Sequence, residues 1–599
     1  MGIEEHVRAL IHTALTDLVR DGAVPSDVLG ADFAVERPKR PEHGDLATNA
    51  ALALQKLAKK QPRELAVLLQ AKLSASPDVQ AAEIAGPGFL NLRLAPSVFH
   101  AVVTDVLAQG AAYGRAPAAI GERVLVEFVS ANPTGPLLVS HARGAILGDA
   151  VARLLEAAGH RVVREYYVND FGNQVKLLGD SVRAILEGRE TPEGGYGAPY
   201  VKELADWIAE HAAAALADPD PWVLARTCIT RVLEGVPGSQ TLPGIKRTLA
   251  SIGVVHDVWI SEESLHRWGR VAAALGELKQ RGYLEEREGA LFFKSETEGD
   301  DKDRVVKKRD GAFTYFASDI AYHADKIGRG FDRLIDVWGA DHHGYVARVR
   351  AAITALGLPE NRFEVLLYQL VFLLRNGEPV KMGKRLGNIV TIEEILDEID
   401  GAAGRTGAGA DALRYFYLSR RSDTTVDFDI EIAKKASLDN PAIYLQYGYA
   451  RASSILRRAK DVFHVEPPRP TAAALAALVH PDELAVTARL GRFPAVVREA
   501  AALREPHRIV FYLQELSQEF QSYFTRHKDD PILPGAKVTA HEGWETSWDW
   551  DKTRARLAWV LAIRTAYGAA LGLLGITALD RMERIEARGA GEAGEEIGA

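Results

Sequence analysis

One segment near residue 135 has the residue types of a phosphate-binding turn. Residues 132–136 are Asn-Pro-Thr-Gly-Pro, they follow a β-branched run that ends at Val129, and His141 comes shortly afterwards. A tight turn that leads into a helix offers backbone N–H groups and the positive end of the helix dipole, and both favour a phosphate. We therefore expect His141 to donate a hydrogen bond to a triphosphate. A helix-capping loop with a polar histidine also fits this segment when it is taken alone.

A second segment, Lys381-Met382-Gly383-Lys384-Arg385, supplies cations on a glycine-containing stretch. Flexible ammonium groups on such a loop can close on pyrophosphate as negative charge builds on the leaving group. A solvated basic loop would contain the same lysines. The occurrence of both segments, in this order along one chain, favours a site that cleaves ATP.

A third cluster suits a cationic substrate. Tyr315 precedes Asp319 by four residues, so on a helix both side chains can reach one ligand. Glu127 on the preceding strand adds a second carboxylate. A guanidinium pairs best with planar carboxylates that satisfy its fixed donors, so the cluster fits an arginine side chain. Each residue alone is also compatible with a structural role.

The segment Gly339-Ala-Asp341-His342-His343 has adjacent histidines next to a carboxylate. Neighbours at a strand end point to opposite faces, and no cysteine or histidine stands at zinc-ligand spacing. We therefore predict no metal site here and expect the segment to line the nucleotide pocket.

These residues need a scaffold of alternating strands and helices. Residues 124–129, a helix over about 141–158 and a strand in "RVVREYYV" form a β-α-β pattern, and "RLIDVWGADHH" supplies a later strand. Such alternation predicts a parallel sheet, whose ligands bind beyond the carboxyl ends of its strands. In the first 110 residues, Leu46, Leu52, Leu54 and Leu57 predict a helical stripe, and Pro62 is placed to begin the next helix.

Bulk properties set the class of protein. A chain of 599 residues should hold several domains. The single cysteine, Cys228, excludes an internal disulfide framework and predicts a reducing, cytoplasmic compartment. The N-terminus lacks the apolar core of a signal peptide, and no apolar run reaches the ~20 residues of a membrane span. The net charge of −9 neither supports nor excludes RNA binding, because a polyanion needs only a local basic face.

Motifs spread along nearly the whole chain are similar to those of the arginyl-tRNA synthetases, a family of class I aminoacyl-tRNA synthetases. They include "PKRPEHGDLATNAAL", "EFVSANPTGP", "YYVNDFGNQV", "TYFASDIAYH", "VWGADHHGYVARV", "GEPVKMGKRLGN" and "NPAIYLQYGYARA". The resemblance implies a monomer with a Rossmann-type α/β catalytic core, an N-terminal α+β domain that contacts tRNA and a C-terminal all-α domain that binds the anticodon. We expect these domains at residues 1–112, 113–405 (with an insertion at about 185–285) and 406–585, and a disordered tail at 586–599.

The implied activity is the ATP-dependent attachment of L-arginine to tRNA(Arg) through arginyl-adenylate, with tRNA required for activation. Mg²⁺ would enter with ATP, without a dedicated protein cage. On the arginine side the resemblance and the clusters above give Glu127, Ser130, Asn132, Tyr315 and Asp319. On the ATP side they give Pro133, Thr134, Gly135, Ser140, His141, Gly339, Asp341, His342, His343, Lys381, Met382 and Lys384, of which His141, Lys381 and Lys384 are the predicted catalytic residues.

Three positions depart from the family pattern. The family marks its ATP site with two signatures: a His-rich first signature, here Leu138–His141, and a Lys-Met-Ser-Lys second signature, here Lys381–Lys384. Leu138 stands where the first histidine of the first signature is usual, Ser140 stands where its glycine is usual, and Gly383 stands where the serine of the second signature is usual. Two alternatives therefore stay open: a catalytically weakened paralogue that binds tRNA or arginine, and a class I enzyme with another specificity, such as cysteine or methionine. The retained Asp319 and Glu127 favour arginine.

Overall fold

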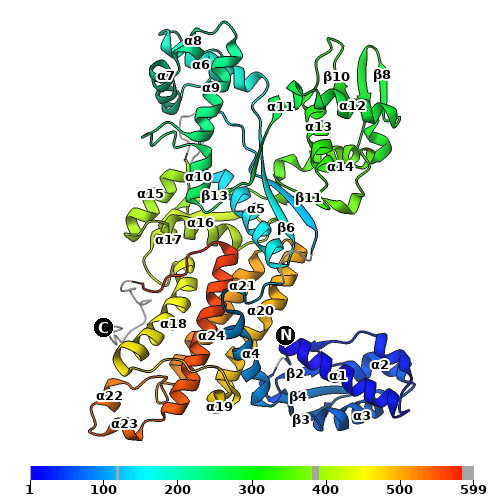
Figure 1. The fold of residues 1–599 in the computed structure, drawn as a ribbon, viewed down its shortest axis with the longest axis vertical. Helices are drawn as coiled ribbons and strands as arrows, with labels where there is room; N and C mark the ends of the chain where they lie inside the picture. Colours follow the sequence, from blue (N-terminus) through cyan, green and yellow to red (C-terminus); the bar gives the residue numbers. More distant parts are fainter. Residues whose placement is uncertain (1, 39, 117–120, 381–389, 583–599) are drawn as a thin grey trace.

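The computed structural model describes residues 2–38, 40–116, 121–380 and 390–582. A central sheet carries two lobes above it, a bundle of long helices below it, and an N-terminal module beside the bundle (Figure 1). The predicted catalytic lysines Lys381 and Lys384, with Met382, lie outside the described residues, and so does the predicted tail at 586–599.

The N-terminal module packs helices on an antiparallel sheet in the order β1-β2-β4-β3. Pro62 begins α3, as predicted, since its fixed φ suits the first helical position. Leu46, by contrast, lies in β2 and not on the predicted helical stripe, because it pairs with Leu92 of β4. The elements are α1 (Ile3–Arg20), β1 (Val35–Glu36), β2 (Leu46–Thr48), α2 (Ala50–Ala58), α3 (Pro62–Ser74), β3 (Val79–Ala85), β4 (Phe89–Leu94) and α4 (Pro96–Gln109).

The core is a five-stranded sheet in the order β12-β11-β5-β6-β7, and all its neighbouring strands are parallel. The α/β prediction is confirmed. The long helix α5 (Val139–Ala157) follows β5 and is buried on nearly every side, which explains its Ala- and Gly-rich sequence. The strands are β5 (Arg123–Phe128), β6 (Arg161–Val168), β7 (Val258–Ser261), β11 (Arg333–Gly339) and β12 (Phe363–Tyr368).

Two excursions leave this sheet and form the upper lobes (Figure 1). The first separates β6 from β7 and consists of α6 (Asn173–Leu186), α7 (Pro199–His211), α8 (Ala213–Ala217), α9 (Pro221–Glu234) and α10 (Ile245–Ser251). We expected one insertion at about 185–285. Strand β7 lies within that range but belongs to the central sheet, so the chain makes two separate excursions. The second consists of α11 (Glu262–Arg267), α12 (Arg270–Gln280), β8 (Leu284–Arg287), β9 (Ala290–Phe293), β10 (Arg304–Lys307) and α13 (Tyr315–Gly328).

Helix α14 (Val346–Ala355) connects β11 to β12, and after β12 the chain enters a small sheet. Here β13 (Val371–Arg375) pairs with β14 (Glu378–Pro379) on one side and β15 (Val426–Asp429) on the other. Strand β15 interrupts a region expected to be wholly helical, because it pairs in parallel with β13. The helices around and after it are α15 (Ile392–Ala403), α16 (Ala408–Leu418), α17 (Ile430–Lys434), α18 (Pro441–Phe463), α19 (Ala472–Leu475), α20 (Pro481–Leu503), α21 (His507–Arg526), α22 (Ala536–Thr539), α23 (Trp544–Ser547) and α24 (Trp550–Leu574).

Helix α24 is the centre of this bundle. By length and composition alone it could cross a membrane, which the sequence prediction did not anticipate, but 67% of its most apolar window is buried in the protein. Helices α18, α20 and α21 pack around it. Burial within the bundle therefore accounts for its apolar character.

Candidate active site

A cavity of about 660 Å³ opens at the carboxyl ends of β5, β6 and β11. Side chains from α5 and α13 complete its wall. This is the position that a parallel sheet provides for a ligand, since strand ends meet there and loops diverge. It brings together nine of the predicted site residues: Glu127, Ser130, Asn132, His141, Tyr315, Asp319, Gly339, Asp341 and His342.

The turn after β5 is strained. Val129 and Ser130 have φ angles of 72° and 39°, values that non-glycine residues, and β-branched ones above all, rarely adopt. The turn directs the Ser130 hydroxyl to Glu127, to which it donates at 2.8 Å, while it accepts from the backbone N–H of Tyr167 at 3.1 Å. These two hydrogen bonds hold the strained turn, which ends at the cavity edge where Asn132 lies.

Glu127 lines the cavity, but its carboxylate already has partners. Lys326 Nζ lies 2.5 Å from Glu127 Oε2 and 2.7 Å from Asp336 Oδ1, and Ser130 holds the other oxygen of Glu127. Lys326 and Asp336 are fully buried beneath the cavity. Two carboxylates thus share one ammonium, His323 Nε2 lies 2.9 Å from the other oxygen of Asp336, and burial raises the pKa of Glu127.

The Tyr315–Asp319 pair occupies the first turn of α13, as the spacing predicted. Asp319 faces the cavity and accepts a hydrogen bond from the Tyr345 hydroxyl, and burial raises the pKa of this carboxyl. Tyr315 stands at the rim with 67% of its surface exposed. Burial disfavours the ionised form of Asp319, and the positive charge of a bound guanidinium would favour that form again.

Glu262 is a cavity residue that the sequence analysis missed. It is the first residue of α11, directly after β7, and it is 2% exposed. Burial raises its pKa to about 7. The side-chain amide of Asn169 lies 2.8 Å from Glu262 and 2.9 Å from Asn132 Oδ1. In the sequence, Glu262 stands in a Ser-Glu-Glu segment that resembles an ordinary helix start and gives no signal of a site.

His141 closes the start of α5. Its Nδ1 accepts from the backbone N–H of Leu138 at 2.9 Å, which places the proton of the neutral ring on Nε2. The N–H of Val139 donates to the Val390 carbonyl at 3.1 Å. Two N–H groups at this helix start, which we expected to favour phosphate, are therefore bonded within the protein. The bond from Val139 also joins the start of α5 to the chain that follows residues 381–389.

Five of the predicted ATP residues in the described part of the chain do not line the cavity. Pro133, Thr134, Gly135, Ser140 and His343 are not among the residues that line the cavity. The Tyr200 hydroxyl from α7 donates to the Thr134 carbonyl at 2.7 Å, and a Cβ added at Gly135 would lie 2.8 Å from the Tyr200 ring. Ser140 is exposed on the first turn of α5. Asp341, His342 and His343 lie on a 3-10 helix after β11, where only the first two line the cavity.

The cavity therefore has two chemically different sides. Glu127, Glu262 and Asp319 make one side acidic and largely buried, which suits a guanidinium. The other side has His141, Asp341 and His342, with both His342 and Asp341 widely exposed. A cationic substrate and a nucleotide can meet between them.

Comparisons with known proteins cover most of the chain. Residues 5–94 match the arginyl tRNA synthetase N terminal domain, residues 102–211 and 240–406 match the catalytic domain of class I (R) tRNA synthetases, and residues 445–582 match the DALR anticodon binding domain. The arginine–tRNA ligase of Thioalkalivibrio sulfidiphilus is 42% identical over 97% of this chain and 100% of its own. That of a Methylobacterium species is 43% identical over 96% and 98%. The arginyl-tRNA synthetase structure of Thermus thermophilus has the same fold, with a TM-score of 0.69, 23% identity and coverage of 97% of this chain and 100% of its own.

Proposed function

Because the chain belongs to the arginyl-tRNA synthetase family, and so joins arginine to tRNA(Arg) at the expense of ATP, we propose which of its residues carry the reaction. The observation that carries the proposal is the acidic, buried side of the cavity. Asp319 and Glu262 bind the guanidinium of arginine, and Tyr315 covers it at the rim. Glu127, already held by Lys326, acts by accepting from Ser130 and so holding the turn at the edge of the pocket.

Asn132 and the edge fixed by Ser130 hold the α-amino end of arginine, since they lie at the end of β5 facing the same cavity. The arginine carboxylate then points toward His141. There it attacks the α-phosphate of ATP, pyrophosphate leaves, and the terminal ribose of tRNA takes the aminoacyl group. Positioning and charge stabilisation suffice for both steps, without a covalent enzyme intermediate.

On the ATP side, His141 Nε2 donates to the phosphates, with Ser140 beside it on the first turn of α5. Gly339, Asp341 and His342 line the nucleotide end. Lys381 and Lys384 neutralise the departing pyrophosphate. Mg²⁺ arrives with the phosphates: it keeps several waters and needs few protein ligands, and Asp341 is the exposed carboxylate on this side.

The wider assignments rest on the family and on the fold. We assign tRNA contact to residues 1–112, catalysis to 113–405 and anticodon binding to 406–585, and we propose that bound tRNA is required for arginine activation. We propose a monomer that works in the cytoplasm. The single cysteine, which is buried in α9, agrees with a reducing compartment.

Arginylation of total tRNA, with each labelled amino acid supplied in turn, tests the activity, and Asp319→Ala tests the pocket. Removal of one partner of a desolvated charge pair costs ~2–5 kcal/mol, so the arginine KM should rise roughly 30-fold or more. Asp325→Ala is the matched control: Asp325 lies on the same helix but pairs with Arg270 and Arg329 outside the cavity. An unchanged arginine KM in Asp319→Ala, or an equal rise in the control, would refute the pocket assignment.

A further inference from the structure

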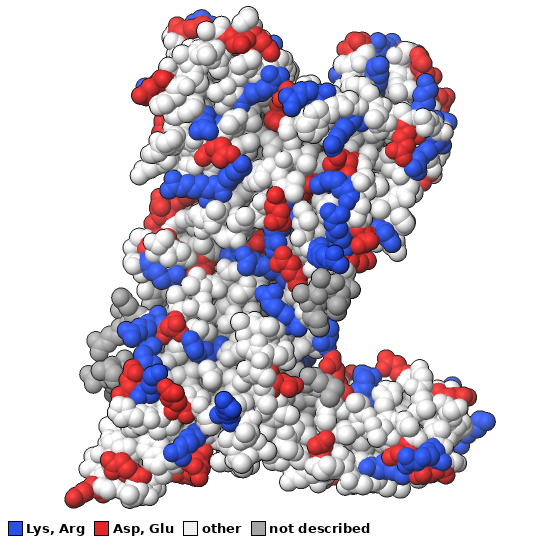
Figure 2. Space-filling view, in the orientation of Figure 1, with Lys and Arg blue, Asp and Glu red and all other residues white. Residues whose placement is uncertain are grey.

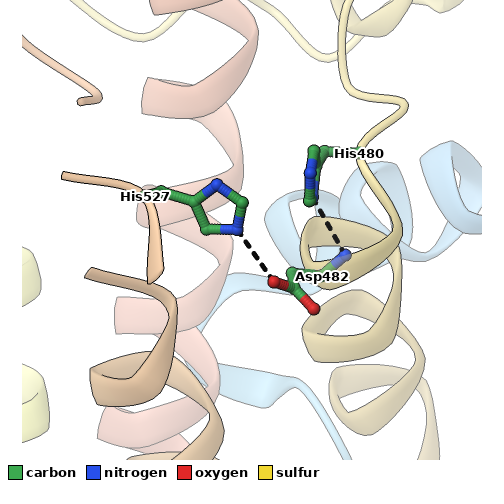
Figure 3. A group of neighbouring side chains, drawn as sticks. All are labelled: His480, Asp482 and His527. Atoms are coloured by element: carbon green, nitrogen blue, oxygen red, sulfur yellow. Dashed lines mark hydrogen bonds and ion pairs between the residues drawn. The ribbon is translucent and has the colours of Figure 1, made fainter. Parts of the chain in front are cut away.

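His480, Asp482 and His527 form a polar group in the C-terminal bundle, and their hydrogen bonds give this group a structural role (Figure 3). The Asp482 carboxylate accepts from His527 Nε2 at 2.8 Å and from Arg526 at 3.0 Å. His480 Nδ1 accepts from the backbone N–H of Asp482 at 3.2 Å. The group caps α20 and ties its start to the end of α21.

A second group, centred on Asp149, joins parts of the chain that lie far apart in the sequence. Arg414 of α16 is 1% exposed and uses all three nitrogens of its guanidinium. Nε donates to the Leu574 carbonyl at 2.6 Å, Nη1 donates to the Ile252 carbonyl at 2.7 Å, and Nη2 donates to the Asp149 carboxylate. One side chain thus contacts α5, α16 and the ends of α10 and α24.

Arg153, one turn beyond Asp149 on α5, repeats these contacts. It donates to Asp149 Oδ2 at 2.7 Å, to the Gly253 carbonyl at 3.0 Å and to the Gly572 carbonyl at 3.4 Å. The last carbonyls of a helix have no partner within the helix and carry the negative end of its dipole. Two guanidiniums therefore cap the ends of both α10 and α24, and both also donate to the Asp149 carboxylate. We call Asp149, Arg153, Arg414 and these four carbonyls the Asp149 hub.

The hub fits closely at the end of α24. A Cβ added at Gly575 would lie 2.4 Å from the Arg414 guanidinium, so the helix ends directly against it. Next to the hub, Asp411 of α16 accepts from the Thr577 N–H and from Gln446 of α18, both at 2.8 Å. The C-terminal bundle is thus bonded to α16 at its end, and α16 is bonded to the middle of α5.

We propose that Arg414 is a positioning residue for arginylation, which holds α5 in register with the end of α24. Asp149 lies eight residues from His141 on α5, about 12 Å along the helix. A buried planar guanidinium has fixed donors, so a shift of the end of α24 breaks one of its bonds unless α5 follows. The state of the C-terminal bundle then sets the position of His141. This inference rests on the proposed roles of His141 and of bound tRNA.

The test is Arg414→Lys, which keeps the charge but cannot make the three bonds together. We expect kcat for arginylation at saturating tRNA to fall about tenfold or more, as for the loss of a charge-assisted hydrogen bond. The tRNA Kd should stay within about twofold, because Arg414 is too buried to touch RNA. Arg153→Gln, at the partly exposed edge of the hub, should lower kcat in the same direction by a smaller factor.

Arg556→Lys is the matched control. Arg556 is also 1% exposed and is paired with Glu483 and Asp530, but it lies 18 residues from Leu574, about 27 Å along α24. It should lower thermal stability and leave kcat within about twofold, with all variants assayed well below their unfolding temperatures.

Three results would overturn the role of the hub. The first is that Arg414→Lys weakens tRNA binding but leaves kcat normal. The second, which applies if Arg414→Lys does not fold, is that Arg153→Gln leaves kcat unchanged. The third is that Arg556→Lys lowers kcat as much as Arg414→Lys does. Wild-type ATP–pyrophosphate exchange without tRNA would instead contradict the tRNA requirement alone.

Discussion

Glu262 is the cavity acid whose protonation changes near neutral pH. Burial raises its pKa to about 7, so without a ligand the carboxyl is partly protonated at neutral pH. A guanidinium binds the ionised form, because the two charges then compensate each other. The arginine KM should therefore rise as pH falls below about 7, approaching tenfold per pH unit. Steady-state arginylation between pH 8 and pH 6, at saturating ATP and tRNA, measures this.

The same group has a predictable effect on stability. The folded carboxyl holds its proton up to about pH 7, whereas the unfolded one loses it near 4.5, so Glu262 destabilises the free protein as pH rises between those values. Arginine removes that cost, and its stabilising effect on Tm should be larger at pH 8 than at pH 6. Glu262→Gln should abolish both trends. If the pH dependence of KM survives that substitution, another group titrates and our assignment of Glu262 is wrong.

Ser140 and Leu138 make a separate prediction about the altered first signature. The Leu138 side chain does not line the cavity. Leu138 contributes to the start of α5 through its backbone N–H, which donates to His141 Nδ1. Leu138→His should bring little gain in rate. Ser140→Gly restores the family residue yet removes an exposed hydroxyl from the first turn of α5, and it should slow tRNA-dependent ATP–pyrophosphate exchange by roughly tenfold. A neutral Ser140→Gly with a strongly accelerated Leu138→His would mean that the signature is simply impaired.

What the sequence could predict at this scale depended on local spacing. Tyr315 and Asp319 could be predicted to lie near each other because they are one helical turn apart, whatever the rest of the fold does. Glu262 could not be found, because it reaches the cavity only through the pairing of β7 with β6. The engagement of Glu127 by Lys326 was equally hidden, since the two residues are 199 positions apart.

At the scale of elements, α7 of the first excursion supports the turn before α5. A Cβ at Gly135 would lie 2.8 Å from the Tyr200 ring, whose hydroxyl bonds the Thr134 carbonyl. Gly135→Ala should therefore destabilise the protein by ~1–3 kcal/mol through overpacking, and it should raise the ATP KM by moving the turn. Thermal unfolding and ATP-dependent kinetics measure the two effects.

Tyr200→Ala provides the control for this contact. If the clash is the cause, Gly135→Ala should add almost nothing in a Tyr200→Ala background, so a double-mutant cycle shows strong coupling. Additive effects would mean that Gly135 acts independently of α7. Any residue larger than glycine at position 135 would require Tyr200 to move.

The strands show which elements a sequence can reveal. β5, β6 and β11 were predicted because long β-branched or aromatic runs alternate with a helix in between. β7 and β15 are four residues each, and they are strands only because a parallel neighbour supplies their hydrogen bonds. Leu46 was assigned to a helix for the same reason: spacing alone does not show the pairing of β2 with β4.

At the scale of the whole molecule, the N-terminal module lies against the C-terminal bundle. The Tyr113 hydroxyl donates to the Leu490 carbonyl at 2.7 Å, and His100 Nε2 lies 2.8 Å from the Leu478 carbonyl. Glu5 of α1 pairs with Arg498 of α20. The region matched to the N-terminal domain thus contacts the region matched to the anticodon-binding domain through Glu5, and the residues that follow it, α4 and Tyr113, pack on α20.

The distribution of charge on the molecule bears on how it binds RNA. Lys and Arg are interspersed with Asp and Glu over the face shown in Figure 2. Two basic residues of α18 already have partners within the protein: Arg451 lies 3.9 Å over the Phe524 ring, and Lys460 pairs with Glu466 at the surface. A local group of basic side chains can contact phosphates even where the net charge is negative.

We accordingly predict that tRNA affinity falls steeply with salt despite the acidic net charge. If about six phosphates are neutralised, Kd should weaken roughly 10³-fold between 50 and 200 mM salt. A minihelix that lacks the anticodon arm should bind with a shallower salt dependence, because it loses the contacts made by the C-terminal bundle, and it should be arginylated far more slowly. Fluorescence titration of both RNAs over a salt series measures the slopes. Equal slopes and equal charging rates would place recognition outside the bundle, whereas binding that is insensitive to salt would rule out phosphate contacts as its main source.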